Sequence, residues 1–307
     1  MGVIQNNNKR SDRSHRFLLV AVLCLVVFCV SAQVVDTLRN VGGTVKKETK
    51  PVVVKDSAAG RSGQTGQSRQ VRNRPAAKSK VYLLHSDLLR KDAEHPEAQI
   101  VIGNVRFRHD SIYMYCDSAC YYDKISSFEA FGNVRMEQGD TLFLYGDRLY
   151  YDGLTQIARM RDNVRMENRT TTLLTDSLNY DRVYNLGYFF DGGTMMDDQN
   201  VLTSEWGEYS PQTKQSVFNY NVRLVNPQFT LTSDTLRYNT ATKIADIVGP
   251  SDIWSDANHI YSEKGTYNTV TGMADLYDRS VLTNEGRQLT GDTLFYNRNT
   301  GVGEAFH

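Results

Sequence analysis

The feature that most constrains this chain of 307 residues is an internal repeat, in which similar motifs return at a nearly constant spacing. An acidic residue followed by x-Leu-x-Tyr recurs, most clearly at Asp147, Asp176, Asp234 and Asp292. A second motif, Asn-Val preceded by Gly, Asp or Tyr, keeps step with the first. Such a period is typical of stacked units that bury their apolar faces only against their neighbours. The acidic residues of the repeat lie at positions 87, 117, 147, 176, 205, 234, 263 and 292.

Each unit predicts β-strands. In residues 140–152 most side chains are β-branched, aromatic or aliphatic, and Gly and Asp supply turns. The acidic residue, the Leu two positions later and the Tyr four positions later have the same parity, so we expect them to share one face of a strand. The Asn-Val motifs predict turns that lead into strands. We therefore expect an all-β fold over residues 81–307, an elongated, solenoid-like array of all-antiparallel or mixed β-strands with about eight 29–30-residue repeats, each with two or three short strands.

Residues 1–80 differ in charge from the rest, with a net charge of +11 against −11 for residues 81–307. An acidic body argues against nucleic acid as a partner. The apolar run at 17–30 is too short, at ~1.5 Å per residue, to span a ~30 Å hydrocarbon core. It ends in Val30-Ser31-Ala32, which suits a cleavage site. We expect a signal peptide over 1–32 and a flexible basic linker over 33–80; the alternatives are an uncleaved membrane tether and a linker lying on an anionic surface.

The sequence offers no constellation for catalysis or for metal binding. No two of the six histidines have metal-ligand spacing, and there is neither a G-x-S-x-G motif nor a Gly-rich phosphate loop. For the repeated acidic residues, hydrogen bonding at turns or strand entries is a better interpretation than calcium binding, which needs glycine-rich nonapeptides. We therefore expect no enzymatic activity, no catalytic residue, no metal site and no cofactor. Cys116 and Cys120 would lie ~13 Å apart on one strand, which leaves pairing between copies or two buried thiols open.

The repeats of D-x-L-x-Y with a G-N-V element, behind a signal peptide, resemble the OstA/LptA family. Members of that family are periplasmic lipopolysaccharide-transport proteins of Gram-negative bacteria, related to the N-terminal domain of the outer-membrane LptD. The resemblance covers residues 81–307 and implies a β-jellyroll, open at both ends, that stacks head to tail and carries the acyl chains of lipid A inside. It implies lipopolysaccharide and other transport components at the inner and outer membranes as partners, and the periplasm as location. Ala119, Gly207 and Gly265 replace the repeat Leu, and the number of units leaves the stoichiometry of any bridge open.

The resemblance also implies which side chains contact lipid: the repeat leucines and the valines of the Asn-Val motifs. The same apolar residues equally suit a dry core closed to ligand. A second hypothesis is a structural or adhesive β-solenoid that binds a protein or glycan on an outer face with Trp206, Trp254 and the pairs Tyr121-Tyr122 and Tyr150-Tyr151. A polysaccharide lyase or hydrolase would need an acid–base cluster that interrupts the repeat. The predicted lipid-binding residues are Val105, Val134, Leu149, Val164, Leu178, Val222, Leu236 and Leu294.

Overall fold

A computed structural model of the chain describes residues 79–91, 93 and 96–307. The expected signal peptide and all but the last two residues of the expected linker lie outside this range. The described residues belong to one compact unit, 77–307. Their helical structure is limited to a 3-10 turn, η2 (Asp123–Ile125). In this part of the chain no helix has the length and apolar character to cross a membrane.

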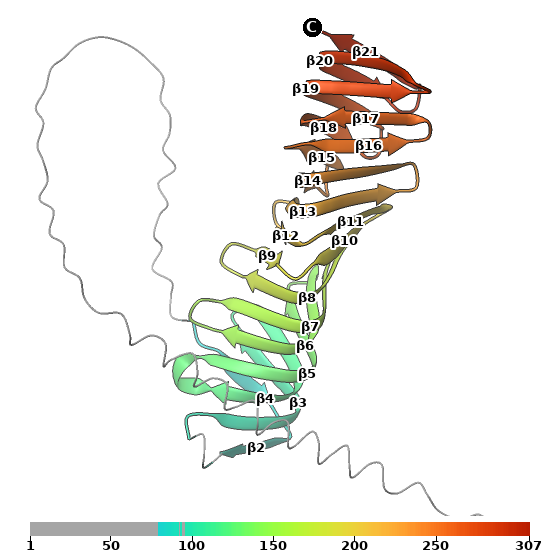
Figure 1. Cartoon of the computed structure of the whole chain (residues 1–307). Coiled ribbons are helices and arrows are strands. Elements are labelled where there is room, and N and C mark those ends of the chain that lie inside the picture. Colours follow the sequence, from blue (N-terminus) through green and yellow to red (C-terminus); the bar gives the residue numbers. More distant parts are fainter. Residues whose placement is uncertain (1–78, 92, 94–95) are drawn as a thin grey trace, which may run out of the picture. The chain divides into compact units, whose positions relative to one another are not determined.

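The unit is built from antiparallel strands of two lengths (Figure 1). The short strands have four or five residues: β1 (Tyr82–His85), β2 (Leu88–Lys91), β9 (Leu186–Phe189), β10 (Gly193–Asp197), β11 (Asn200–Ser204), β12 (Trp206–Tyr209), β15 (Ile244–Ile247), β16 (Ser251–Ser255), β17 (Asn258–Ser262), β18 (Lys264–Asn268) and β21 (Val302–Phe306). The long strands have 11 or 12 residues: β3 (Gln99–His109), β4 (Ile112–Tyr122), β5 (Ser127–Gln138), β6 (Leu142–Asp152), β7 (Ile157–Asn168), β8 (Thr171–Asp181), β13 (Gln215–Asn226), β14 (Phe229–Asn239), β19 (Met273–Asn284) and β20 (Arg287–Asn297).

The pairings divide every long strand into two halves that belong to different layers. The first half of β8, for example, pairs with β10, whereas its second half pairs with β9. We call layer 1 the strands β1, β10, β11, β16 and β17 together with the half-strands that continue their ladder. Layer 2 contains β2, β9, β12, β15, β18 and β21 with the other halves. The fold is thus an all-β jellyroll, as the sequence predicts, but its strands are longer than expected.

Bulges at mid-strand carry the chain from one layer to the other. In β5 the register with β6 shifts between Phe131 and Val134, where Gly132 and Asn133 both have positive φ, 75° and 45°. Two consecutive left-handed residues bend a strand without ending its ladder. A Cβ at Gly132 would lie 2.5 Å from Asp117 Oδ2, so the position also needs glycine for space. The prediction that Asn-Val motifs lead from turns into strands is therefore wrong: they lie at bends inside the strands.

The repeated acidic residues hold these bends together. Asn104, Asn133 and Asn163 donate side-chain hydrogen bonds to the carboxylates of Asp87, Asp117 and Asp147, at 2.8, 2.8 and 2.6 Å. Hydrogen bonding is thus the role of these acidic residues, as expected. The expectation that they share a face with the repeat Leu and Tyr is wrong, because the bulge breaks the alternation and leaves the acidic residue exposed while Leu and Tyr are buried.

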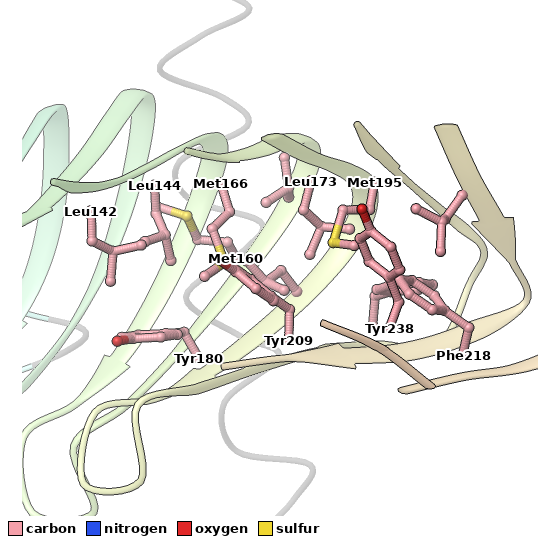
Figure 2. Close-up of a cluster of buried hydrophobic side chains, with 14 of the residues drawn as sticks. Leu142, Leu144, Met160, Met166, Leu173, Tyr180, Met195, Tyr209, Phe218 and Tyr238 are labelled. Carbon is pink, nitrogen blue, oxygen red and sulfur yellow. The ribbon is translucent and has the colours of Figure 1, made fainter. Parts of the chain in front are cut away.

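The core lies between the two layers and continues along the whole unit as one cluster of buried side chains. Within layer 2 the repeat Leu and Tyr face this core, as Leu178 and Tyr180 illustrate with no exposed surface. Layer 1 contributes Leu, Met, Val and Phe from the facing half-strands. Figure 2 shows the two sets meeting, with Leu144, Met166 and Leu173 on one side and Tyr180, Tyr209 and Tyr238 on the other.

Candidate functional site

The predicted lipid-binding residues all lie in the core, and they form its side nearest to the bends. The four valines follow directly after bends in layer 1, and the four leucines follow them in layer 2. None is more than 2% exposed. The structure therefore brings together, in one cluster, Val105, Val134, Leu149, Val164, Leu178, Val222, Leu236 and Leu294.

Side chains of the two layers fill the space between them. The rings of Phe107 in layer 1 and Phe128 in layer 2 stack at 4.1 Å, and Phe229 meets Tyr267 edge to face at 4.7 Å. Where Gly207 replaces the repeat Leu, the ring of Phe189 lies 2.5 Å from the place of a Cβ. Because its own side chains occupy the core at these points, a ligand would enter by displacing them.

Opposite the bends, the hairpin turns of layer 1 and layer 2 meet along a side that we call the mouth. Tyrosines of layer 2 form hydrogen bonds here with residues at the strand ends of layer 1, 41 or 42 positions away. The hydroxyl of Tyr151 lies 2.6 Å from His109 Nδ1 and accepts a hydrogen bond from Arg182 at 2.8 Å. We call each such tyrosine with its partners a clasp.

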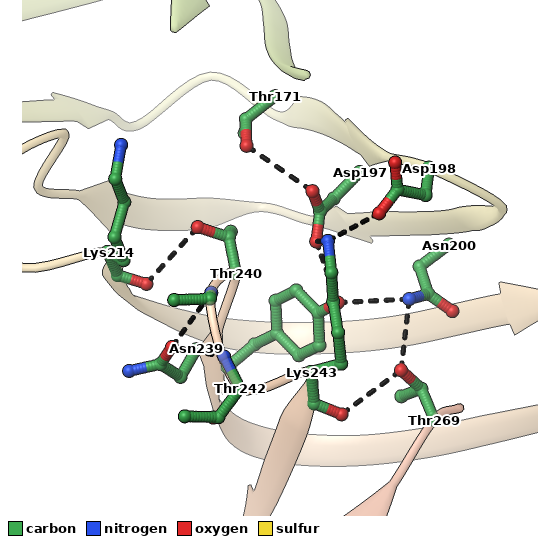
Figure 3. A network of polar contacts seen from close by, with 12 residues as sticks. Thr171, Asp197, Asp198, Asn200, Lys214, Asn239, Thr240, Thr242, Lys243 and Thr269 are labelled. Atoms are coloured by element: carbon green, nitrogen blue, oxygen red, sulfur yellow. Dashed lines mark hydrogen bonds and ion pairs between the residues drawn. The ribbon is translucent and has the colours of Figure 1, made fainter. Parts of the chain in front are cut away.

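The clasp of Tyr238 contains a buried ion pair (Figure 3). Lys243 Nζ lies 2.7 Å from Asp197 Oδ2 and 2.6 Å from Asp198 Oδ2, and Tyr238 donates to the same Asp197 oxygen at 2.8 Å. The carboxylate of Asp197 has no exposed surface. Asn200 donates to Tyr238 Oη at 2.9 Å and thereby extends the network. Polar contacts therefore close the mouth over an apolar core.

Burial shapes the titration of the clasps. It raises the pKa of Tyr151 to about 12 and that of Tyr180 to about 12, so both hydroxyls stay protonated and able to donate. Burial, together with the nearby Arg182, lowers the pKa of His109 and favours its neutral form. For Lys243, burial lowers the pKa, but hydrogen bonds and charge from Asp197 and Asp198 outweigh it, so the pKa is raised overall.

The outer face carries an open groove of about 880 Å³ at the bends, and its lining includes Val134 and Val164, which also belong to the core. Tyr145 and Arg165 are among its lining residues, with the guanidinium 4.4 Å from the ring centroid. Of the aromatic residues considered for an adhesive face, Trp254 is 42% exposed and stacks on His259. Tyr121 and Tyr151 are instead core residues, at 5% and 0% exposure, so the two tyrosine pairs do not form exposed pairs.

Cys116 and Cys120 are both buried as thiols. Cys116 belongs to the core cluster whereas Cys120 does not, because the bulge between Tyr115 and Ser118 inverts the alternation within β4. Burial raises the pKa of Cys116 to about 12, which keeps it protonated. Within the described ranges, no group of three or more His, Cys, Asp or Glu residues is arranged to hold a metal ion.

Sequence reasoning missed the clasps, although the repeat contains a signal for them. Lys214 and Lys243 are separated by one period of the repeat, and so are Asn168 and Asp197, which accept from them. What the repeat does not reveal is that partners 41 to 46 positions apart in the chain face each other across the mouth. That follows only from the bends at mid-strand.

Comparison with known proteins places these features in a family. A crystal structure of LptH from Pseudomonas aeruginosa, described as the LptA-homologous periplasmic component of the lipopolysaccharide transport device, is similar at 16% identity and a TM-score of 0.33. The similar region covers 36% of this chain and 85% of LptH, and the similarity is too low to assign a common fold. No curated protein matches. The model of the family of OstA-like proteins matches residues 78–234 and 230–292. The chain, matched over most of its length, belongs to the OstA-like protein family.

Proposed function

We propose that this protein is a non-enzymatic carrier that binds lipopolysaccharide and moves it across the periplasm of a Gram-negative bacterium to the outer membrane. The observation that carries the proposal is the continuous apolar core between two layers, in a chain of the OstA-like family. The resemblance of the repeats to the OstA/LptA family supplies the ligand class. No covalent bond forms or breaks in this function.

The acyl chains of lipid A would lie between the layers, against the leucines and valines of the core. Each CH₂ group removed from water contributes about 0.8 kcal/mol, so a few chains suffice for tight binding. The core is filled by its own side chains, and the layers must separate to admit a lipid. The bends join the layers on one side, whereas the mouth is held by polar clasps that water or a lipid headgroup can replace. The mouth is therefore the side that opens.

Both ends of the sheet present edges for a second copy. In the described residues, β1 and β2 pair only with β3, and β21 pairs only with β20. Leu89 on β2 and Phe306 on β21 are about half exposed, at 49% and 52%. Strand addition at such edges uses backbone hydrogen bonds and would join the cores of successive copies. We propose head-to-tail association of this kind, with other lipopolysaccharide-transport components engaging the terminal edges of the row.

Photocrosslinking tests the core as the lipid site, with two phenylalanines as a matched pair. Phe218 is 1% exposed and faces the core, whereas Phe190 is 44% exposed. Each is replaced in the full chain by a photoreactive phenylalanine analogue, in cells that make lipopolysaccharide. The proposal expects a lipopolysaccharide adduct at Phe218 and none at Phe190. Adducts at Phe190 alone would refute it.

The outer groove supports a second candidate function, that of a structural or adhesive protein that binds a protein or glycan on its outer face. The groove combines aromatic, basic and acidic side chains, which suits a glycan. This function leaves the core dry. A chain that binds glycans through Tyr145 and Arg165, and that yields no lipid adduct at Phe218, would favour it over the carrier.

A further inference from the structure

Two turns of layer 2 place a lysine in the same position at the mouth. Lys214 and Lys243 are separated by one period of the repeat, and both have positive φ, 64° and 61°. Each ammonium reaches a residue at the end of a layer 1 strand: Lys214 donates to Asn168 Oδ1 at 2.5 Å and Lys243 to Asp197 Oδ2 at 2.7 Å. The two clasps are therefore built alike, and differences in their partners can be compared directly.

The partners differ in charge. Lys243 faces Asp197 and Asp198, whereas Lys214 faces Asn168 and Arg169 at the equivalent positions of the preceding repeat. Arg169 and Asp198 both occupy a left-handed turn position, with φ of 58° and 54°. In three other hairpins of layer 1 the equivalent left-handed turn position is acidic, at Asp110, Asp256 and Glu285, and in the hairpin between β5 and β6 it is Gly139.

The clasp of Tyr209, in which Asn168 accepts from both Tyr209 and Lys214, consequently carries two positive charges and contains no carboxylate. Among the described residues neither Lys214 nor Arg169 forms an ion pair, and the acceptor for Lys214 is the neutral amide of Asn168. Burial and the charge of Arg169 lower the pKa of Lys214; Asp197 opposes this, but its carboxylate already binds Lys243 and Tyr238. An anion entering here would be attracted by both cations.

The core beneath this clasp is rich in methionine. Met166 lies two residues before Asn168 on the same face of β7, and Met160 and Met195 are buried nearby (Figure 2). The backbone of Gly187 approaches closely, since a Cβ there would lie 3.2 Å from Met166 Sδ. Methionine is flexible and repacks around ligands more readily than branched side chains. The site of excess positive charge thus lies above an adaptable part of the core.

We propose that Arg169 and Lys214 bind the phosphate group of a lipid headgroup at the mouth, with its acyl chains in the methionine-rich core below. The inference rests on the proposed function and assigns a place to the polar end of the lipid. A phosphate accepts hydrogen bonds from the planar guanidinium of Arg169 and from the ammonium of Lys214 at once. Asn168 holds Lys214 toward the mouth and is itself fixed by Tyr209, which donates to it at 3.2 Å.

The test compares the full wild-type chain with an Arg169→Gln, Lys214→Gln double variant. Dissociation constants are measured for diphosphorylated lipid A, for the same lipid with its phosphates removed, and for inorganic phosphate. The wild type should prefer the phosphorylated lipid, and the double variant should lose about tenfold in affinity per cation for that lipid only. Lys264→Gln, at an exposed lysine of β18, serves as the control and should change nothing. Unchanged circular dichroism would establish that the variants fold.

A second variant inverts the charge. Asn168→Asp with Arg169→Asp copies the Asp197–Asp198 pattern and should abolish the preference for phosphate while strengthening the clasp. Equal affinity of the wild type for the two lipids would overturn this inference and leave the proposed function standing. Binding of inorganic phosphate without binding of either lipid would overturn both the headgroup assignment and the proposed function.

Discussion

Replacing Lys243 by Met is the sharpest perturbation of the closed mouth. The substitution keeps the length and the apolar part of the side chain but removes the ammonium that lies 2.7 Å from Asp197. Asp197 has no exposed surface and would retain only Tyr238, at 2.8 Å, and Thr171, at 3.4 Å, as side-chain donors. A carboxylate buried without a counter-charge is costly, so we expect a marked loss of stability.

The expected loss in the free energy of unfolding follows from the burial of the two charged groups. Removing one partner of a buried ion pair costs about 3–5 kcal/mol, and the partial exposure of Lys243, 18%, argues for about 3 kcal/mol. The contact with Asp198 adds little because that carboxylate is 55% exposed. For a domain of this size about 3 kcal/mol lowers Tm by roughly 6–12 °C. Lys214→Met, in the equivalent turn, removes a hydrogen bond to a neutral amide and should cost only about 1 kcal/mol.

Thermal and urea unfolding of the two single variants, followed by circular dichroism, measure this difference. A double-mutant cycle with Asp197→Asn isolates the interaction of the pair, which should be about 2 kcal/mol or more. If Lys243→Met and Lys214→Met cost the same, the Asp197–Lys243 pair does not hold the mouth closed and the reasoning fails.

Three further predictions concern the bends, the mouth and the sheet edges. Gly132→Ala, at φ 75° and 2.5 Å from Asp117, should cost about 2 kcal/mol in urea unfolding, whereas Gly139→Ala, with positive φ but open space, should cost about half of that; equal costs would refute the packing argument. Because burial lowers the pKa of His109, the unfolded state binds the proton first, so wild-type stability should fall as pH drops below about 6.5, and His109→Gln should flatten that part of the Tm profile. Leu89→Lys should leave Tm unchanged but abolish self-association in analytical ultracentrifugation; persistent oligomers would place the contact elsewhere.

The strands and the core could be predicted from the local alternation of apolar residues within each repeat. Leu178 and Tyr180 lie two positions apart, and this spacing correctly predicts the buried face of their strand, because both residues belong to the same half-strand. The same parity argument fails at Asp176, since this residue lies opposite the bulge of β7, where β8 passes from layer 1 to layer 2. Alternation predicts a face only as far as the next pair of left-handed residues. In the structure each of the four valines directly follows such a pair and lies in the core.

The closed mouth could not be predicted, because its contacts join residues that no local pattern connects. Tyr238 reads as another core tyrosine, yet its hydroxyl meets Asp197 of a different layer. An aspartate next to a hairpin turn, such as Asp197 at the end of β10, is expected to be solvated, and only the folded chain shows it fully buried beside Lys243. Long-range polar pairs of this kind depend on the angle by which the strands bend, and this angle cannot be predicted from the residue types at the bends.

Mass spectrometry of the chain purified from the periplasm of a lipopolysaccharide-producing bacterium tests whether the core between the layers holds the acyl chains of lipopolysaccharide. We expect lipid A species bound in about equimolar amount and released when the chain is unfolded. A folded chain that carries no lipid A, and that takes none up on titration, would contradict it.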